Sequence, residues 1–336
     1  MNFLNSKEIS QLIISSDNIL LCLHQSPDPD SIVSNLLMSK YLDRLGKKYK
    51  IVCFDNIPDK FKTTYKTEDV VVDNLSVESF DINEFDLFIS LDVNEPIRCG
   101  FSNDIKFRSL INIDHHGTEN TFSGLKINDS SYSSTSEMLF YFLEDVNYSL
   151  SKDEADLVLM GIVTDTDAFS YAGDSRVFRT VSMCVDLGAS YEKASEIIYR
   201  NNSVDQLKFW GEALKRIRID KKNRFAYTSI DIKTLKKFSG LLQSNRTVAD
   251  KFIRTIEGTD FGMAMVESDG GYLKISVRSR SNDYNVMPLL KMLNGGGHFS
   301  GGGGRIDLPF KKAVKEALKI ARKFAKSNLQ ENEKSI

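Results

Sequence analysis

The chain of 336 residues has no apolar run that approaches the ~20 residues needed to cross a lipid bilayer. It has only four cysteines, Cys22, Cys53, Cys99 and Cys184, and none of them lies in a CxxC pair. This spacing excludes a disulfide framework and a zinc knuckle, and we expect buried, reduced thiols. Residues 1–8 also lack the basic-then-apolar order of a signal peptide. We therefore expect a cytoplasmic protein that does not contact the membrane.

The net charge is small, −2, but it is unevenly distributed along the chain. Residues 1–204 contain 18 Lys/Arg and 32 Asp/Glu, whereas residues 205–336 contain 26 Lys/Arg and 14 Asp/Glu. An acidic N-terminal part favours cation binding and a basic C-terminal part favours an anionic partner, although a solvated surface explains any single lysine equally well. The low pI, near 6.2, disfavours a long nucleic-acid duplex, which needs many phosphate contacts.

The chain has no internal repeat and no Pro-rich linker, and its first half alternates short apolar runs with amphipathic segments. Short runs rich in Ile, Val, Leu and Phe are typical of strands that helices bury on both faces. The alternation therefore predicts an α/β fold with a doubly wound parallel sheet. The expected strands are 18–24, 49–54, 86–92 and 110–114, and the expected helices are 31–45, 136–145, 153–163 and 175–187.

We expect three parts in the chain. The doubly wound domain spans 1–190, a continuous helical segment over 191–219 connects it to the rest, and a smaller α/β domain with a mixed sheet spans 220–330. In the smaller domain, strand-like alternation occurs at 225–230, 260–267 and 272–280, and helical periodicity at 286–293 and 310–326.

Histidine is scarce, and all four histidines lie in motifs that suggest chemistry. Three of them neighbour aspartates at predicted strand ends, in His24-x-x-x-Asp28-x-Asp30 and in Asp114-His115-His116. Ligands of doubly wound sheets collect beyond the carboxyl ends of the strands, and imidazole and carboxylate groups can share a metal ion. The pattern predicts an enzyme with a dinuclear metal centre.

Further aspartates follow the same pattern. Asp92 ends an apolar run, where a buried carboxylate is costly unless a cation or hydrogen bonds meet its charge. Asp165 and Asp167 close the helical segment 153–163. For Asp30, a helix N-cap is an equally good interpretation. Capping or loop solvation explains any one of these patches, but it does not easily explain all of them together.

The basic part contains Arg278 and Ser279 in a strand-like run, followed by the motif Gly295-Gly296-Gly297-His298. Arginine binds phosphate through two parallel hydrogen bonds, and glycine leaves backbone N–H groups open to phosphate oxygens. His298 would stack on a base or bind phosphate. A flexible linker is the alternative for the glycine run 295–304, but its place between a predicted helix and a predicted strand favours substrate binding.

From residue 24 to residue 304, the chain contains in this order the motifs H-x-x-P-D-x-D, a strand-end Asp, D-H-H-G, G-I-x-x-D-T and G-G-G-H. This ordered set resembles the DHH phosphoesterase superfamily with its DHHA1 domain. The resemblance implies two divalent cations per site, usually Mn²⁺, with other divalent cations possible. It implies a substrate-binding role for Arg278, Ser279, Gly295–Gly297 and His298. It further implies that one ion is held by His24, Asp28 and Asp92, and that the other is held by Asp30, Asp92, His115 and Asp165. Asp114 would orient an imidazole, and His116 would face the scissile phosphate.

Two departures from the family pattern are present: the first alters a turn but leaves the ligands, and the second concerns substrate preference more than activity. Pro29 replaces the small residue between the aspartates of the first motif, and the stretch 300–304, Ser-Gly-Gly-Gly-Gly, replaces a small-residue A-A-G stretch.

The resemblance implies a Mn²⁺-dependent phosphodiesterase that hydrolyses cyclic di-AMP, its linear product pApA and short RNA oligomers by a two-metal water attack on phosphorus. The alternative is a phosphatase of 3′-phosphoadenosine 5′-phosphate (PAP) with nanoRNase activity. A non-catalytic nucleotide sensor would lack metal ligands, and a family II inorganic pyrophosphatase would lack the motif at 295–298. The apolar stripe 155–162 is a candidate homodimer interface, and core packing explains it equally well.

Overall fold

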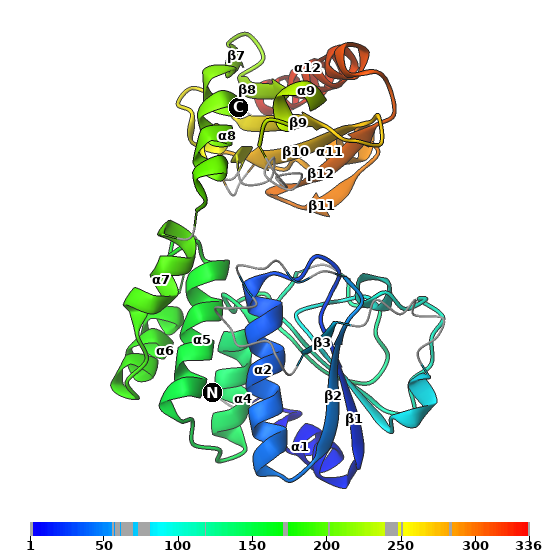
Figure 1. Ribbon diagram of the computed structural model, residues 1–336, viewed down its shortest axis with the longest axis vertical. Coiled ribbons are helices and arrows are strands. Elements are labelled where there is room, and N and C mark those ends of the chain that lie inside the picture. The colour runs from blue at the N-terminus through cyan, green and yellow to red at the C-terminus, as the bar shows by residue number, and fades with distance from the viewer. Residues whose placement is uncertain are drawn as a thin grey trace. The chain divides into compact units, whose positions relative to one another are not determined.

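The computed structural model describes residues 3–55, 57, 61, 70–72, 81–117, 119–170, 174–200, 202–238, 248–249, 251–281 and 284–334. The chain divides into two compact units, Met1–Asn201 and Asn202–Ile336. Each unit is built on one six-stranded sheet (Figure 1). Within the ranges above, no helix is long and apolar enough to cross a membrane.

The N-terminal unit contains a parallel sheet with the strand order β3-β2-β1-β4-β5-β6, the order of a doubly wound fold, as the sequence predicts. The order reverses between β1 and β4, which creates a switch point at their carboxyl ends. The strands are β1 (Asn18–Cys22), β2 (Lys48–Cys53), β3 (Val70–Val72), β4 (Leu87–Leu91), β5 (Leu110–Asp114) and β6 (Leu125–Asn128).

Helices cover one face of this sheet, where alternate strand residues such as Ile19 and Leu21 enter the main core. On the opposite face, Leu20 and Cys22 pack into a second cluster that includes Phe88 and Phe101. The helices of the main core are α1 (Ser6–Ser15), α2 (Pro29–Arg44), α4 (Thr135–Asp145), α5 (Lys152–Asp165), α6 (Ser175–Asp186) and α7 (Tyr191–Tyr199). The short 3₁₀ helices η3 (Ile82–Glu84) and η4 (Pro96–Cys99) contribute Ile82 and Cys99 to the second cluster on the opposite face.

The apolar stripe 155–162 lies on α5 and is part of this core. Ala155, Val158, Leu159 and Ile162 are fully buried within the unit. Core packing therefore accounts for the stripe without a second copy of the chain.

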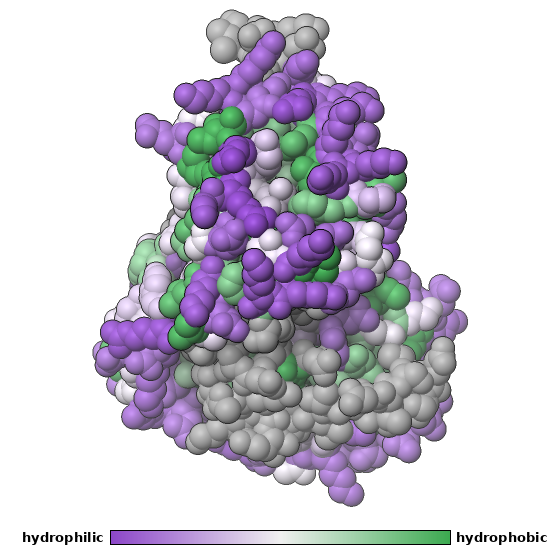
Figure 2. Space-filling view, turned by 45° about the horizontal axis from the view of Figure 1, so that its top comes forward, coloured by the Kyte–Doolittle hydropathy of each residue, from purple (hydrophilic) through white to green (hydrophobic). Residues whose placement is uncertain are grey.

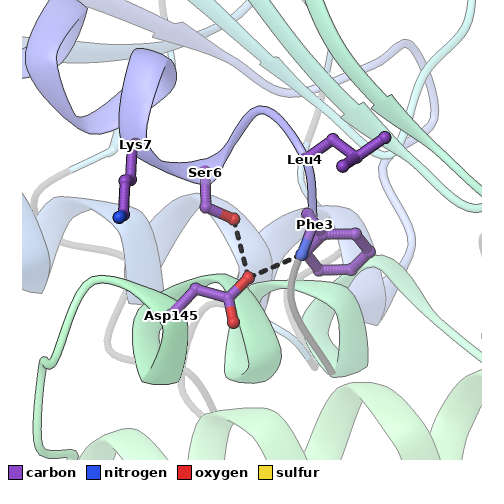
Figure 3. A pocket seen from close by; sticks show the side chains of 5 residues that line it. All are labelled: Phe3, Leu4, Ser6, Lys7 and Asp145. Carbon is purple, nitrogen blue, oxygen red and sulfur yellow. Dashed lines mark hydrogen bonds between the residues drawn. The ribbon is translucent and has the colours of Figure 1, made fainter.

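A shallow pocket lies where α1 meets the end of α4 (Figure 3). Asp145 accepts hydrogen bonds from the Phe3 N–H group at 2.8 Å and from the Ser6 hydroxyl at 2.7 Å, and Leu4 and Lys7 complete the lining. Asp145 is the last residue of α4, at the opposite end of the helix from the site described below. This contact anchors the N-terminus and takes no part in that site.

The continuous helical segment expected over 191–219 is wrong. Helix α7 ends at Tyr199, and α8 (Val204–Lys215) begins after Ser203, whose side chain accepts a hydrogen bond from the Gln206 N–H group. Serine competes for backbone hydrogen bonds in a helix interior but is favoured as an N-cap, which explains the new start at Ser203. The segment then enters strand β7 (Arg218–Asp220).

The C-terminal unit has the mixed sheet that the sequence predicts, in the order β11-β12-β10-β9-β8-β7. Only β8 and β9 pair in parallel among its described strands. Hydrophilic side chains cover much of the face of this unit that Figure 2 shows. Its other elements are β8 (Phe225–Ile230), α9 (Ile232–Leu235), η5 (Ile253–Thr255), β9 (Phe261–Glu267), β10 (Leu273–Ser279), α11 (Met287–Met292), β11 (Gly296–His298), β12 (Gly301–Ile306) and α12 (Phe310–Lys334).

Candidate metal centre

The predicted histidines and aspartates of the first half gather beyond the carboxyl ends of three adjacent strands. His24 lies two residues after β1, Asp92 directly follows β4, and Asp114 ends β5 ahead of His115 and His116. Because β1 and β4 are neighbours at the switch point and β5 is next to β4, one sheet edge brings these side chains together.

The side chains form three overlapping groups, and within each group all ligand atoms lie within 4.8 Å of one another. Asp92 and His115 each belong to two of the groups. The groups are His24 with Asp28 and Asp92, Asp30 with His115 and Asp165, and Asp92 with His115 and His116.

Asp92 directs one carboxylate oxygen toward each side of the site. Its Oδ2 lies 3.7 Å from His24 Nε2, and its Oδ1 lies 3.6 Å from His115 Nε2. Asp28 Oδ1 lies 3.6 Å from the same nitrogen of His24, and Asp165 Oδ2 lies 3.2 Å from that of His115. Asp92 therefore stands between two sets of donors.

The imidazoles of His24 and His115 are oriented by backbone carbonyls. Nδ1 of His24 lies 2.8 Å from the carbonyl oxygen of Gln25, and Nδ1 of His115 lies 3.4 Å from that of Tyr132. In the neutral imidazole that a metal ion requires, donation from Nδ1 to these carbonyls leaves Nε2 unprotonated and directed at the carboxylates.

Asp28 and Asp30 have different roles at the start of α2. Asp28 is the N-cap of the helix and accepts a hydrogen bond from the Ser31 N–H group at 3.1 Å. Asp30 lies in the first turn and is buried, with its two oxygens accepting from the N–H groups of Thr135 and Ser136 at 2.7 and 3.1 Å. The N-cap interpretation of Asp30 is therefore wrong, because Asp28 occupies that position.

Asp114 holds His116 in place. The fully buried Asp114 carboxylate accepts a hydrogen bond from His116 Nδ1 at 2.7 Å and from the His116 N–H group at 3.3 Å. His116 Nδ1 also lies 3.7 Å from Asp92 Oδ1, but its shorter bond to Asp114 makes this nitrogen a poor cation ligand. The geometry favours orientation of His116 over coordination by it.

The pKa values show how strongly the donors interact without a cation. Burial raises the pKa of Asp30 to about 7, and the charge of Asp92 adds to this. Burial, with the charges of Asp30 and Asp92, also raises the pKa of Asp165 well above its usual value. For His24, burial alone would lower the pKa, but Asp28 and Asp92 more than offset this, so its pKa is raised well above the usual value. Without a cation, the negative charge of the carboxylates is therefore partly neutralised by bound protons.

These residues fit divalent cations. His24 Nε2 is buried and has no hydrogen-bond partner among the described residues. An unsatisfied buried polar atom is costly, and a cation at this nitrogen would remove the cost. Imidazole nitrogen and carboxylate oxygen together suit first-row divalent metals.

Sequence reasoning missed the segment 131–137, which supplies the hydrogen bonds to Asp30. Thr135 also donates its hydroxyl to Asp92 Oδ1 at 3.1 Å. The available signal was Ser134-x-x-Glu137, a helix-start pattern: Ser134 caps α4 by accepting from the Glu137 N–H group. That pattern predicts a helix start but not what its free N–H groups bind.

In the C-terminal unit, the predicted phosphate-binding residues Arg278 and Ser279 lie on β10 and Gly296–His298 lie on β11, with β12 between the two strands. Arg278 is buried against Gly301, where a Cβ atom would come within 2.5 Å of the Arg278 side chain. Its Nη1 donates to the carbonyls of Val277 and Gly302. The backbone N–H and the hydroxyl of Ser279 both donate to the Ser300 carbonyl oxygen, at 2.8 and 3.0 Å.

The glycine run is not a flexible linker. Gly296 and Gly297 lie in β11, which pairs with the glycines of β12, and Gly295 approaches the β12 backbone too closely to admit a Cβ atom. The side chain of His298 lies outside the described part of the chain.

The chain is similar to known proteins along most of its length. Residues 18–162 match the DHH family, N-terminal domain. The chain is 26% identical over 323 residues to the bifunctional oligoribonuclease and PAP phosphatase NrnA of Thermus thermophilus, which covers 90% of this chain and 89% of that protein. The corresponding NrnA of Bacillus subtilis is 26% identical over 296 residues, covering 87% of this chain and 90% of that protein.

Two further matches extend the comparison. The cyclic-di-AMP phosphodiesterase PdeA of Listeria monocytogenes is 24% identical over 341 residues, covering 93% of this chain but 48% of that protein. A solved exopolyphosphatase-related protein from Bacteroides fragilis has the same fold, with a TM-score of 0.87, 24% identity, and coverage of 96% and 97% of the two chains. The N-terminal unit therefore contains a domain that matches the DHH family, whose phosphoesterases hydrolyse phosphoric esters with the help of metal ions.

Proposed function

We propose that this protein hydrolyses phosphoric ester bonds of small nucleotides and that it uses two divalent cations, with Mn²⁺ as the first candidate. The position of Asp92 is the observation that carries the proposal, because its two oxygens are directed at two different groups of donors. We assign His24, Asp28 and Asp92 to one cation. We assign Asp30, Asp92, His115 and Asp165 to the other. When bound, such a pair of cations would activate water and stabilise negative charge on phosphoryl oxygens.

His116 is the proposed proton donor in this reaction. Burial lowers the pKa of His116 and the hydrogen bond to Asp114 raises it. Because Asp114 is not among the proposed cation ligands, this hydrogen bond favours the protonated imidazole when cations are bound at Asp92. The side chain is 35% exposed, so its other nitrogen is accessible to substrate. With Nδ1 held by Asp114, Nε2–H would give its proton to the oxygen that leaves phosphorus.

For substrates, we propose linear nucleotides first: short RNA oligomers, pApA and PAP. The two NrnA relatives match this chain along most of their length and carry names for oligoribonuclease and PAP phosphatase activity. In support, residues 205–336 carry an excess of Lys/Arg, and Arg278, Ser279, Gly295–Gly297 and His298 are our proposed nucleotide-binding residues. Cyclic di-AMP is the second candidate, because the likeness to PdeA extends over 93% of this chain.

A product-resolved turnover assay tests the proposal. The purified protein is stripped with EDTA, reloaded with Mn²⁺ and offered a short RNA, pApA, PAP and cyclic di-AMP in parallel. We expect Mn²⁺-dependent hydrolysis of the linear substrates, and hydrolysis of cyclic di-AMP to pApA would support the second candidate. Binding of nucleotide without turnover of any substrate would contradict the proposal and favour a non-catalytic sensor.

A further inference from the structure

Arg176, on α6, is an almost fully buried cation that belongs to none of the three donor groups. Its guanidinium group lies over the Tyr132 ring, with 3.7 Å between Cζ and the ring centroid. Its Nη2 donates to the backbone carbonyl of Ser131, and its Nε lies 3.5 Å from the Glu137 carboxylate. Arg176 therefore contacts both ends of the segment 131–137.

Glu137 belongs to the same segment and forms hydrogen bonds inside it. This fully buried residue accepts hydrogen bonds on Oε2 from the N–H group and the hydroxyl of Ser133, both at 2.8 Å. Its Oε1 accepts from the Thr180 hydroxyl at 3.3 Å and lies toward Arg176. The Arg176–Glu137 pair thus closes the turn that precedes α4 and joins it to α6.

The turn that this pair closes holds Asp30 directly. Thr135 N–H donates to Asp30 Oδ2 at 2.7 Å, and Ser136 N–H donates to Asp30 Oδ1 at 3.1 Å. Two bonds from one helix start to the two oxygens of one carboxylate fix the plane of that carboxylate. Neither bond depends on a side chain of the turn, so the backbone position of the turn decides where Asp30 points.

The same turn also contacts Asp92 and His115. The Thr135 hydroxyl donates to Asp92 Oδ1, and the Tyr132 carbonyl oxygen faces His115 Nδ1 at 3.4 Å. The segment 131–137 is therefore the element that touches donors from three different parts of the chain. A shift of this segment would move all three donors together.

We propose that Arg176 and Glu137 are positioning residues, which keep the segment 131–137 in the place where it orients Asp30, Asp92 and His115 for cation binding. This inference rests on the proposed function insofar as it takes these residues as metal ligands. Arginine suits the role because its planar group can stack on Tyr132, donate to Ser131 and pair with the Glu137 carboxylate at once, which the single ammonium group of lysine cannot do.

The N-terminal unit contains a control with the same set of contacts in Arg44, whose side chain is 48% exposed against 7% for Arg176. Arg44 also stacks on a tyrosine, with 4.4 Å to the Tyr148 ring centroid, donates to a serine carbonyl, Ser149, and pairs with a buried glutamate, Glu154, at 3.1 Å. Glu154, like Glu137, is the third residue of a helix whose N-cap is serine. None of the contacts described for Tyr148, Ser149 and Glu154 reaches a donor of the candidate metal centre.

The test compares Arg176→Lys with Arg44→Lys by calorimetric titration of Mn²⁺ into the metal-free protein, at a temperature where circular dichroism shows both variants folded. We expect Arg176→Lys to raise the Kd for Mn²⁺ by about tenfold or more, as for other residues that orient metal ligands, and Arg44→Lys to leave it nearly unchanged. Glu137→Gln against Glu154→Gln supplies the same comparison if Arg176→Lys does not fold.

Equal Mn²⁺ affinities in the two variants would overturn the inference and leave Arg176 a purely structural residue. This outcome is distinct from failure of the proposed function. That failure would show as Mn²⁺ binding by the unaltered protein without turnover of any nucleotide, whatever the two variants do. A protein that binds no Mn²⁺ at all would overturn both.

Discussion

Asp92 combines an unusual backbone conformation with the central position among the donors. Its φ angle is 63°, in the left-handed region that residues with a Cβ atom rarely adopt. The conformation is held because the Asp92 N–H group donates to the Ile113 carbonyl oxygen and the buried Asn112 side chain donates to the Val93 carbonyl oxygen at 2.8 Å. Strain of this kind is found at functional sites, where the surrounding structure determines the backbone. These hydrogen bonds therefore fix the backbone at the point where the Asp92 side chain stands between the two sets of donors.

Asp92→Ala should lose Mn²⁺-dependent turnover, because no other side chain directs an oxygen at both His24 and His115 among the described residues. Loss of a residue that only orients a ligand costs about 10- to 100-fold, so loss of the shared ligand should cost at least about a hundredfold in kcat/KM. The assay is Mn²⁺-dependent hydrolysis of pApA, with circular dichroism to confirm the fold. Near-normal activity would refute the two-cation arrangement.

The crossing of α4 and α5 depends on a glycine. Gly161 of α5 faces the first turn of α4, and a Cβ atom there would lie 2.5 Å from Asp30 Oδ1 and would also meet Ser136. The helices can approach this closely only without a side chain, and the approach places Asp30 between them. The motif G-I-x-x-D-T therefore contributes a packing contact at Gly161 as well as the carboxylate of Asp165.

Gly161→Ala should weaken both folding and Mn²⁺ binding. Overpacking a buried position costs about 1–3 kcal/mol, and the carboxylate of Asp30 must move to admit the methyl group. The control is Gly211→Ala in α8, where a Cβ atom has open space and alanine should stabilise the helix by roughly 0.5–1 kcal/mol. Chemical denaturation and Mn²⁺ titration of both variants measure the effect, and unchanged Mn²⁺ affinity in Gly161→Ala would show that the helices separate instead.

Sequence reasoning succeeded where side-chain chemistry follows an apolar strand. His24, Asp92 and Asp114 come directly after or at the end of such runs, and the sheet edge that they share follows from the parallel topology. It failed where backbone groups carry the contact. Asp30 is held by the backbone N–H groups of Thr135 and Ser136. Every residue except proline has such a group, so the residue types do not reveal this contact. Sequence reasoning also offered the N-cap of α2 to Asp30 and not to Asp28, because the two aspartates are equally suitable by residue type.

At the scale of the whole molecule, several donors of the acidic N-terminal unit are protonated when no cation is bound. The pKa of Asp30 is raised to about 7, and the pKa values of Asp165 and His24 are raised well above their usual values. Groups with raised pKa values hold protons at neutral pH in the metal-free protein, and a cation must displace them. Mn²⁺ affinity should therefore fall as the pH is lowered through about 7.

Proton release measures this directly. Calorimetric titration of Mn²⁺ in two buffers of different ionisation enthalpy, at the same pH near 7, should give different apparent heats, because each released proton is taken up by the buffer. The difference should shrink at higher pH, where the metal-free site has already lost its protons. Identical heats in the two buffers would mean that the donors are already deprotonated and that the site is not charged as we infer.

The basic C-terminal unit should affect the KM for nucleotides but not the rate at which an ester without a nucleotide is hydrolysed. Arg278→Ala removes a proposed phosphate ligand, so KM for pApA and short RNA should rise while turnover of a generic ester, bis-p-nitrophenyl phosphate, is spared. The bonds from Arg278 Nη1 to the Val277 and Gly302 carbonyls offer a structural alternative, in which the residue only holds β10 against β12. That alternative predicts an equal loss on both substrates. A rise in KM confined to nucleotides, measured below the Tm of the variant, would assign substrate recognition to the basic unit and the hydrolysis reaction to the acidic one.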